Sequence, residues 1–232
     1  MKNPKINHKI IELWSKYFKD NPSVYAPIFY DDFKRNSILF IGMNPSFSLK
    51  GFKLILKNTE HSNINPISFF KWKNIFLNQN LIDDCIKIEN YSKNNYFYFD
   101  RFVEISKKIG IDWQHIDLFL YKETSQKDFK EHIMDGKKLN QFAIDQINLF
   151  KEILFEIKPQ CIIISNAFAS EIFREYFDNN LLWDKNKGFH WFVMENKKVP
   201  IFFSSMLSGQ RALDRWSYER LVWHIGRAVT DK

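Results

Sequence analysis

In Ser37-Ile38-Leu39-Phe40-Ile41-Gly42-Met43-Asn44-Pro45-Ser46, an unbroken apolar run passes directly into a polar loop. Short continuous apolar runs are typical of strands that are buried on both faces of a parallel sheet. The glycine, asparagine and proline that follow are typical of a loop. We therefore expect a buried strand over 37–41 that ends in a loop over 42–48.

Helices and strands alternate along the rest of the chain. Residues 191–194 and 199–203 allow two interpretations, a hairpin or, for the second segment, a fourth parallel strand. The alternation favours an α/β fold, with one domain over 1–232 and a central four-stranded, mainly parallel sheet flanked by helices. The spacing of apolar residues predicts helices over 10–18, 102–109, 139–157 and 214–228, and further strands over 115–120 and 161–164.

Polar groups follow three of these apolar segments, at 42–48, 117–122 and 204–211. In open α/β sheets, ligands bind outside the carboxyl ends of the strands. We therefore expect the three segments to converge on one functional site.

The composition indicates a soluble globular protein, with 45% hydrophobic and 26% charged residues. No apolar run approaches the roughly 20 residues that span a bilayer, so a cytoplasmic protein with no membrane partner is expected. The net charge of +7 makes nucleic acid the first partner to consider. A lysine-rich surface produced by an AT-rich genome explains the same charge equally well.

Two isolated cysteines, Cys85 and Cys161, cannot form a four-cysteine metal site. The histidines show no HExxH or HxH spacing. We expect no metal, no cofactor and a monomeric chain.

Four motifs together resemble the uracil-DNA glycosylase superfamily, most closely its single-strand-selective and mismatch-specific families. The resemblance covers roughly residues 37 to 228, with no close match between about 50 and 95. In chain order the motifs are Gly42-Met43-Asn44-Pro45-Ser46, Ile116-Asp117-Leu118-Phe119, Lys158-Pro159-Gln160-Cys161-Ile162-Ile163-Ile164 and Met206-Leu207-Ser208-Gly209.

This resemblance implies a uracil-DNA-glycosylase-like fold and hydrolysis of the N-glycosidic bond of a flipped-out nucleotide. It implies that Asn44 orients the attacking water through its side-chain carbonyl, while Gly42, Met43 and Ser46 line the base pocket. A turn residue before proline is the structural alternative for Asn44.

An aromatic side chain is expected to stack on the flipped base. Phe47 and Phe52 follow the first loop, and Phe69 and Phe70 follow the divergent segment. We favour Phe47 or Phe69, although with 24 phenylalanines in the chain any one of them is more readily explained as core.

Asp117 stands where uracil-specific relatives often carry asparagine. An ionised carboxylate only accepts hydrogen bonds, so it matches the amino group of cytosine and repels uracil O4. A strand-end cap or a lysine partner is the structural alternative. Gln114 is a second candidate for base recognition if the register differs.

Met206-Leu207-Ser208 lacks the histidine that would stabilise the leaving base. Ser205 and Ser208 offer only neutral hydroxyls, and His115 and His190 near strand ends are possible substitutes. We therefore expect slow excision of uracil. Ser46, in place of the usual glycine, changes the pocket wall further.

The loop after Ser208 is expected to face DNA. By resemblance, Gln210 or Arg211 fills the gap left by the flipped base, and Arg211 also holds a phosphate. A solvated helix face is the alternative for Arg211 and Arg215. Lys50 and Lys53, with Lys57, form a basic run that would bind the DNA backbone.

These residues predict a monofunctional DNA glycosylase that acts on a modified cytosine, such as the hypermodified cytosines of bacteriophage genomes, in antiviral defence. The alternatives are a uracil-DNA glycosylase of base-excision repair and a non-catalytic nucleic-acid-binding protein of the same fold. An enzyme acting on a free nucleotide is disfavoured, because a small substrate does not need an extended basic surface.

Overall fold

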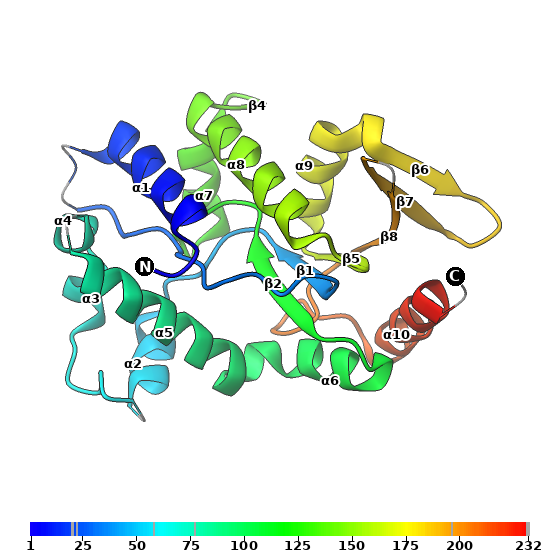
Figure 1. Ribbon diagram of the computed structural model, residues 1–232, viewed down its shortest axis with the longest axis horizontal. Helices are drawn as coiled ribbons and strands as arrows, with labels where there is room; N and C mark the ends of the chain where they lie inside the picture. Colours follow the sequence, from blue (N-terminus) through cyan, green and yellow to red (C-terminus); the bar gives the residue numbers. More distant parts are fainter. Residues whose placement is uncertain (20, 22, 58, 77, 196, 231–232) are drawn as a thin grey trace. The chain divides into compact units, whose positions relative to one another are not determined.

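The computed structural model describes residues 1–19, 21, 23–57, 59–76, 78–195 and 197–230 (Figure 1). The chain forms two compact units, each assembled from three separate segments. The prediction of a single domain stays a prediction. Unit 1 comprises Met1–Phe33, Asn44–Tyr96 and Phe119–Ile153, and unit 2 comprises Lys34–Met43, Phe97–Leu118 and Leu154–Lys232.

Unit 2 contains a mixed six-stranded sheet in the order β2-β1-β5-β8-β7-β6. The first four strands in this order are parallel, and β7 and β6 are antiparallel to their neighbours. The strands are β1 (Ile38–Gly42), β2 (Trp113–Asp117), β5 (Cys161–Ser165), β6 (Leu181–Asp184), β7 (Phe189–Met194) and β8 (Lys197–Ser204).

The expected four-stranded sheet is therefore wrong in its strand number. Both interpretations of residues 191–203 are correct at once, since β8 forms a hairpin with β7 and also pairs in parallel with β5. The additional strand β6 was not predicted because it is short and half exposed, and because its formation depends on pairing with β7. Its turn is closed by Asp184, which accepts from the N–H groups of Asn186 and Lys187.

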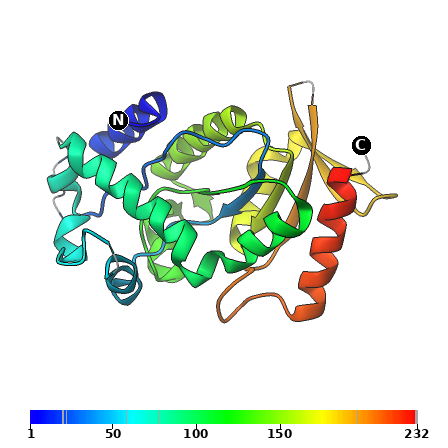
Figure 2. The same ribbon diagram turned by 60° about the horizontal axis from the view of Figure 1, so that its bottom comes forward.

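Helices cover both faces of this sheet. On β1 and β2, Phe40 and His115 are register partners and share a face, and Phe102 of α6 (Asp100–Ile109) stacks on Phe40 at 4.4 Å. On β8, Phe202 is in register with Phe40 through Ile163 of β5, so the next residue, Phe203, points to the other face of the sheet. There it contacts Phe173 of α9 (Ala167–Phe177). Figures 1 and 2 show the two helices on opposite sides of the strands. The remaining helices of unit 2 are η1 (Phe97–Phe99), η2 (Asp178–Asn180) and α10 (Arg215–Thr230).

Unit 1 is mainly helical, and two of its buried amide side chains form hydrogen bonds to the backbone. The Asn7 side chain exchanges hydrogen bonds with the backbone of Tyr30, and Gln146 accepts from the N–H of Leu120. The elements are α1 (Pro4–Phe18), α2 (Leu49–Leu56), α3 (Pro66–Phe69), α4 (Trp72–Ile75), α5 (Gln79–Asn95), α7 (Gln126–Ile133), the two-stranded β3 (Met134–Asp135) and β4 (Lys138–Leu139), and α8 (Gln141–Ile157), which ends in unit 2.

The four predicted helices are confirmed, although α1 begins at Pro4 and not at residue 10, and the strands over 37–41 and 161–164 are confirmed within one residue. The strand expected over 115–120 is displaced, because β2 ends at Asp117. Leu118 still donates to the Gly42 carbonyl, but Leu120 donates to the Gln146 side chain and belongs to unit 1. None of the described helices is long and apolar enough to cross a bilayer.

Candidate functional site

Gly42 and Asp117 lie side by side at the carboxyl ends of β1 and β2, where they are register partners. A β-carbon added to Gly42 would lie 2.1 Å from Asp117 Oδ1 and 3.0 Å from His115 Nε2. The carboxylate therefore occupies the space above Gly42, and no larger residue fits there without displacing it.

Asp117 and His115 point to the same face of β2, since they are two residues apart on one strand. Both are 5% exposed, and His115 Nε2 lies 3.7 Å from Asp117 Oδ1. Tyr98 lies beside them, with its ring centroid 6.4 Å from that of His115. Burial and the Asp117 charge raise the pKa of the Tyr98 phenol, so this hydroxyl stays protonated. A carboxylate, an imidazole and a phenol thus meet at one end of the sheet.

The loop after β8 is tied to the same part of unit 2. Ser208 donates from its hydroxyl to the Tyr98 carbonyl at 2.7 Å, and Leu213 donates to the Met206 carbonyl at 2.9 Å. Gly209 has a φ of 89°, a conformation that favours glycine. Gln210 and Arg211 are exposed at the tip of this closed loop.

Gln114 and His190, the alternative candidates, lie elsewhere in unit 2. Gln114 directly precedes His115 on β2, so its side chain points to the opposite face of the sheet. Its side-chain oxygen accepts a hydrogen bond from the Lys34 N–H at 2.7 Å. His190 is on β7, separated from β2 by three strands, where burial lowers its pKa. Of the two histidines, only His115 lies beside Asp117.

Asn44 belongs to unit 1, where its side-chain amide ties the first loop to residues 121–123. The Nδ2 atom donates to the carbonyls of Glu123 at 2.7 Å, Tyr121 at 3.2 Å and Pro45 at 3.3 Å. The Oδ1 atom accepts no hydrogen bond from the described part of the chain. Ser46 strengthens the same tie through a hydrogen bond to Thr124 at 3.2 Å. The three carbonyls therefore fix the amide nitrogen, and the amide oxygen is left to accept a hydrogen bond from a ligand or water.

Phe47 stacks on Tyr25 at a centroid distance of 4.0 Å and an interplanar angle of 21°. It also contacts Phe52 and Phe70, so three predicted platform candidates form one cluster. Phe69 contacts Phe70 edge to face. Phe47 is only partly buried, which leaves it suited both to core packing and to stacking.

Lys50 and Lys53 are exposed on one side of α2, and the exposed Lys57 directly follows the helix. No resolved ion pair engages them within the described residues. They supply an unneutralised basic strip in unit 1.

The predicted site residues thus fall into both units. Unit 2 holds Gly42, Met43, Gln114, Asp117, Met206, Ser208, Gln210 and Arg211, and unit 1 holds Asn44, Ser46, Phe47, Phe69, Lys50 and Lys53. Two of the points at which the chain passes from one unit to the other, the Met43–Asn44 and Leu118–Phe119 peptide bonds, lie within the predicted site segments.

Two tyrosines next to these sites and a separate group of three side chains were missed from the sequence. Tyr98 and Tyr25 carry no local signal, because each reaches its partner through tertiary folding. Glu60, His61 and Asp84 form the one group of three side chains among the described residues that could hold a metal ion. Glu60 and His61 are adjacent in sequence, but Asp84 joins them only in the folded chain.

Comparison with models of protein families gives no match, and comparison with curated proteins gives none either.

Proposed function

We propose that the chain is a monofunctional DNA glycosylase that excises a modified pyrimidine, and a cytosine derivative before uracil. The placement of Asp117 carries this proposal. Its carboxylate is buried at the carboxyl end of β2 and fills the space above Gly42, where an α/β sheet binds its ligand. Such a group accepts a hydrogen bond from an exocyclic amino group, as on cytosine N4.

Asn44 supports the hydrolytic step. In glycosidic hydrolysis a water attacks C1′ as the C1′–N bond breaks and the base leaves with the bonding electrons. The three carbonyls around Nδ2 fix the amide plane, so Oδ1 presents a positioned acceptor to a water. A neutral amide suits this reaction, because bond breaking runs ahead of proton removal from the water.

His115 is the group best placed to replace the missing histidine near Ser208. It lies 3.7 Å from Asp117 and in the same ring cluster as Tyr98. A donor at this position stabilises negative charge on the departing base. A purely structural His115–Asp117 pair is the competing explanation.

The test uses DNA that contains uracil, 5-hydroxymethylcytosine or glucosylated 5-hydroxymethylcytosine, followed by alkaline cleavage of abasic sites. We expect strand breaks on a cytosine derivative, and a loss of rate of about a hundredfold or more in Asn44→Ala. Thr124→Ala is the matched control, since it removes the hydrogen bond between Ser46 and Thr124 and keeps both Asn44 and Ser46.

Base preference tests Asp117. Asp117→Asn is expected to shift the ratio of uracil to cytosine-derivative excision by about tenfold to a hundredfold, because an amide donates to O4. An unchanged ratio in a folded variant would remove Asp117 from base recognition. Tight DNA binding with no base release from any substrate would refute the glycosylase.

A second candidate, a non-catalytic nucleic-acid-binding protein, is favoured by one observation on α10. Trp216 and Trp223 are 70% and 61% exposed, and Arg220 lies between them on the same side of the helix. Exposed aromatic rings stack on bases, and arginines contact phosphates. This helix face serves a glycosylase equally well, so the excision assay decides between the two functions.

A further inference from the structure

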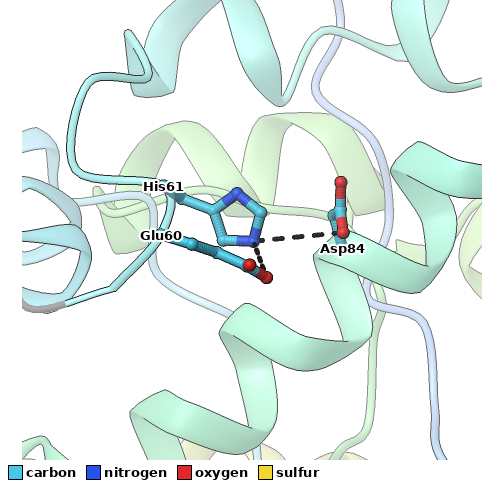
Figure 3. Close-up of side chains that lie close together, drawn as sticks. All are labelled: Glu60, His61 and Asp84. Atoms are coloured by element: carbon cyan, nitrogen blue, oxygen red, sulfur yellow. Dashed lines mark ion pairs between the residues drawn. The ribbon is translucent and has the colours of Figure 1, made fainter.

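Unit 1 contains a second group of chemically active side chains, formed by Glu60, His61 and Asp84 (Figure 3). The first two lie in the turn after α2, and the third lies on α5. His61 Nε2 is 3.5 Å from Glu60 Oε1 and 3.9 Å from Asp84 Oδ1. All three ligand atoms lie within 4.8 Å of one another.

His61 is fixed in place and directed at the carboxylates. Its N–H donates to Thr59 Oγ1, and its carbonyl accepts from Ile64, so the turn holds its backbone at both ends. The side chain is only 11% exposed. Its Nε2 atom is shielded from solvent and has no hydrogen-bond partner within the described residues. A buried nitrogen in this state is costly unless it binds something.

We propose that Glu60, His61 and Asp84 bind a divalent transition-metal ion, with Zn²⁺ as the best fit. Bonds of about 2.1 Å in a tetrahedron separate two ligand atoms by about 3.4 Å, close to the His61–Glu60 separation. An imidazole nitrogen disfavours Mg²⁺ and Ca²⁺, which prefer all-oxygen ligands. Glu60 is 70% exposed, so the fourth position opens to water.

Lys87 is the competing cation at these carboxylates. Its ammonium lies 3.2 Å from Asp84 Oδ1 and 3.6 Å from Glu60 Oε1, and the hydrogen bond to Asp84 raises its pKa. Its side chain is 62% exposed, so it can turn into solvent when a metal ion enters. Lys87 also leaves the imidazole nitrogen of His61 unsatisfied, because Nε2 has no hydrogen-bond partner among the described residues, Lys87 included. A metal ion satisfies all three ligands at once.

Such an ion would join the turn at residues 59–64 to α5. This site is independent of the proposed glycosylase chemistry, since none of its residues takes part in that proposal.

The test titrates Zn²⁺ into the chelator-treated full chain, with a chromophoric chelator as competitor and Co²⁺ absorption as a report of ligand geometry. We expect one ion per chain. Asp84→Asn and His61→Ala are each expected to weaken binding about tenfold or more. Lys87→Met is expected to tighten it, because the competing ammonium is gone.

His8→Ala is the matched control, since His8 is an exposed histidine on α1 outside the group. Circular dichroism confirms that each variant is folded, and the isosteric Asp84→Asn keeps the test valid if His61→Ala does not fold. The proposal is overturned if Zn²⁺ does not bind, if Asp84→Asn binds it as tightly as the unchanged chain, or if Lys87→Met weakens binding.

Discussion

Gly42 ends β1 with ordinary extended backbone, so its role is to leave space and not to adopt an unusual conformation. The space is taken by the Asp117 carboxylate on the neighbouring strand. A loop glycine was expected from the sequence, and a close approach between two strands explains it better. Residue 42 therefore has to be glycine because the Asp117 carboxylate lies where a side chain would begin.

Gly42→Ala is expected to destabilise the protein by about 1–3 kcal/mol, because the added methyl group displaces Asp117 or shifts β1. Urea denaturation measures the change in the free energy of unfolding. Gly226→Ala is the matched control, because its added β-carbon meets only the flexible end of Ile109 at 3.4 Å. In mid-helix this change is expected to stabilise by about 0.5–1 kcal/mol. Equal effects of the two substitutions would contradict the steric argument.

Helices α6 and α10 of unit 2 are joined by a charged network. Glu104 on α6 forms ion pairs with Lys108 at 2.9 Å and with Arg101 at 2.8 Å. The hydrogen bond from Lys108 contributes most to lowering the pKa of Glu104 to about 2, against an ordinary value of 4.5. Tyr218 of α10 completes the network, and burial raises its pKa to about 12.

This network predicts a specific acid sensitivity. A carboxylate with a lowered pKa in the folded state contributes stability above pH 4.5, and the contribution is lost as the pH falls from 4.5 towards about 2. Because Glu104 is 36% exposed, solvent screening limits the effect to less than about 1 kcal/mol. Glu104→Gln is expected to lose that stability at neutral pH and to match the unchanged chain near pH 2.

Urea unfolding at neutral pH and at low pH measures this difference. Glu219→Gln is the control, since its ion pair with Arg215 is confined to α10. If the difference in free energy of unfolding between Glu104→Gln and the unchanged chain does not become smaller at low pH, the ionised Glu104 carboxylate does not stabilise the fold through this network.

The net charge of +7 is distributed over both units. Exposed lysines line α2, and exposed arginines alternate with tryptophans along α10. A DNA-binding surface of this kind releases counterions, so its affinity falls as salt rises.

Salt dependence therefore tests the nucleic-acid partner without reference to catalysis. DNA affinity is expected to fall steeply between about 50 and 200 mM salt. Arg220→Ala is expected to reduce the slope of log affinity against log salt concentration by about one, because one phosphate contact is lost. Fluorescence anisotropy with a labelled strand measures both. Arg215→Ala is the control, because Arg215 is already paired with Glu219. Affinity that is independent of salt would exclude a phosphate-binding surface.

Much of the α/β pattern was predictable because it depends on local signals. The apolar runs at β1 and β5 and the periodic helices α1, α6, α8 and α10 are readable in any window of sequence. The helices between residues 49 and 95 were not predicted, since their apolar spacing is interrupted by asparagine and lysine. Strand β6 was missed because its stability comes from pairing with β7.

The sequence by itself determined the buried central strands, the loop that follows Gly42, the basic charge and the residue types available for chemistry. These follow from composition and from periodicity, which need no knowledge of distant contacts. Tertiary structure decided which of those residues meet. It brought Tyr98 to His115 and Asp117, anchored Asn44 on the carbonyls of residues 121 and 123 and added Asp84 to the neighbouring Glu60 and His61, because these partners are distant in sequence and only the folded chain sets the distances between them.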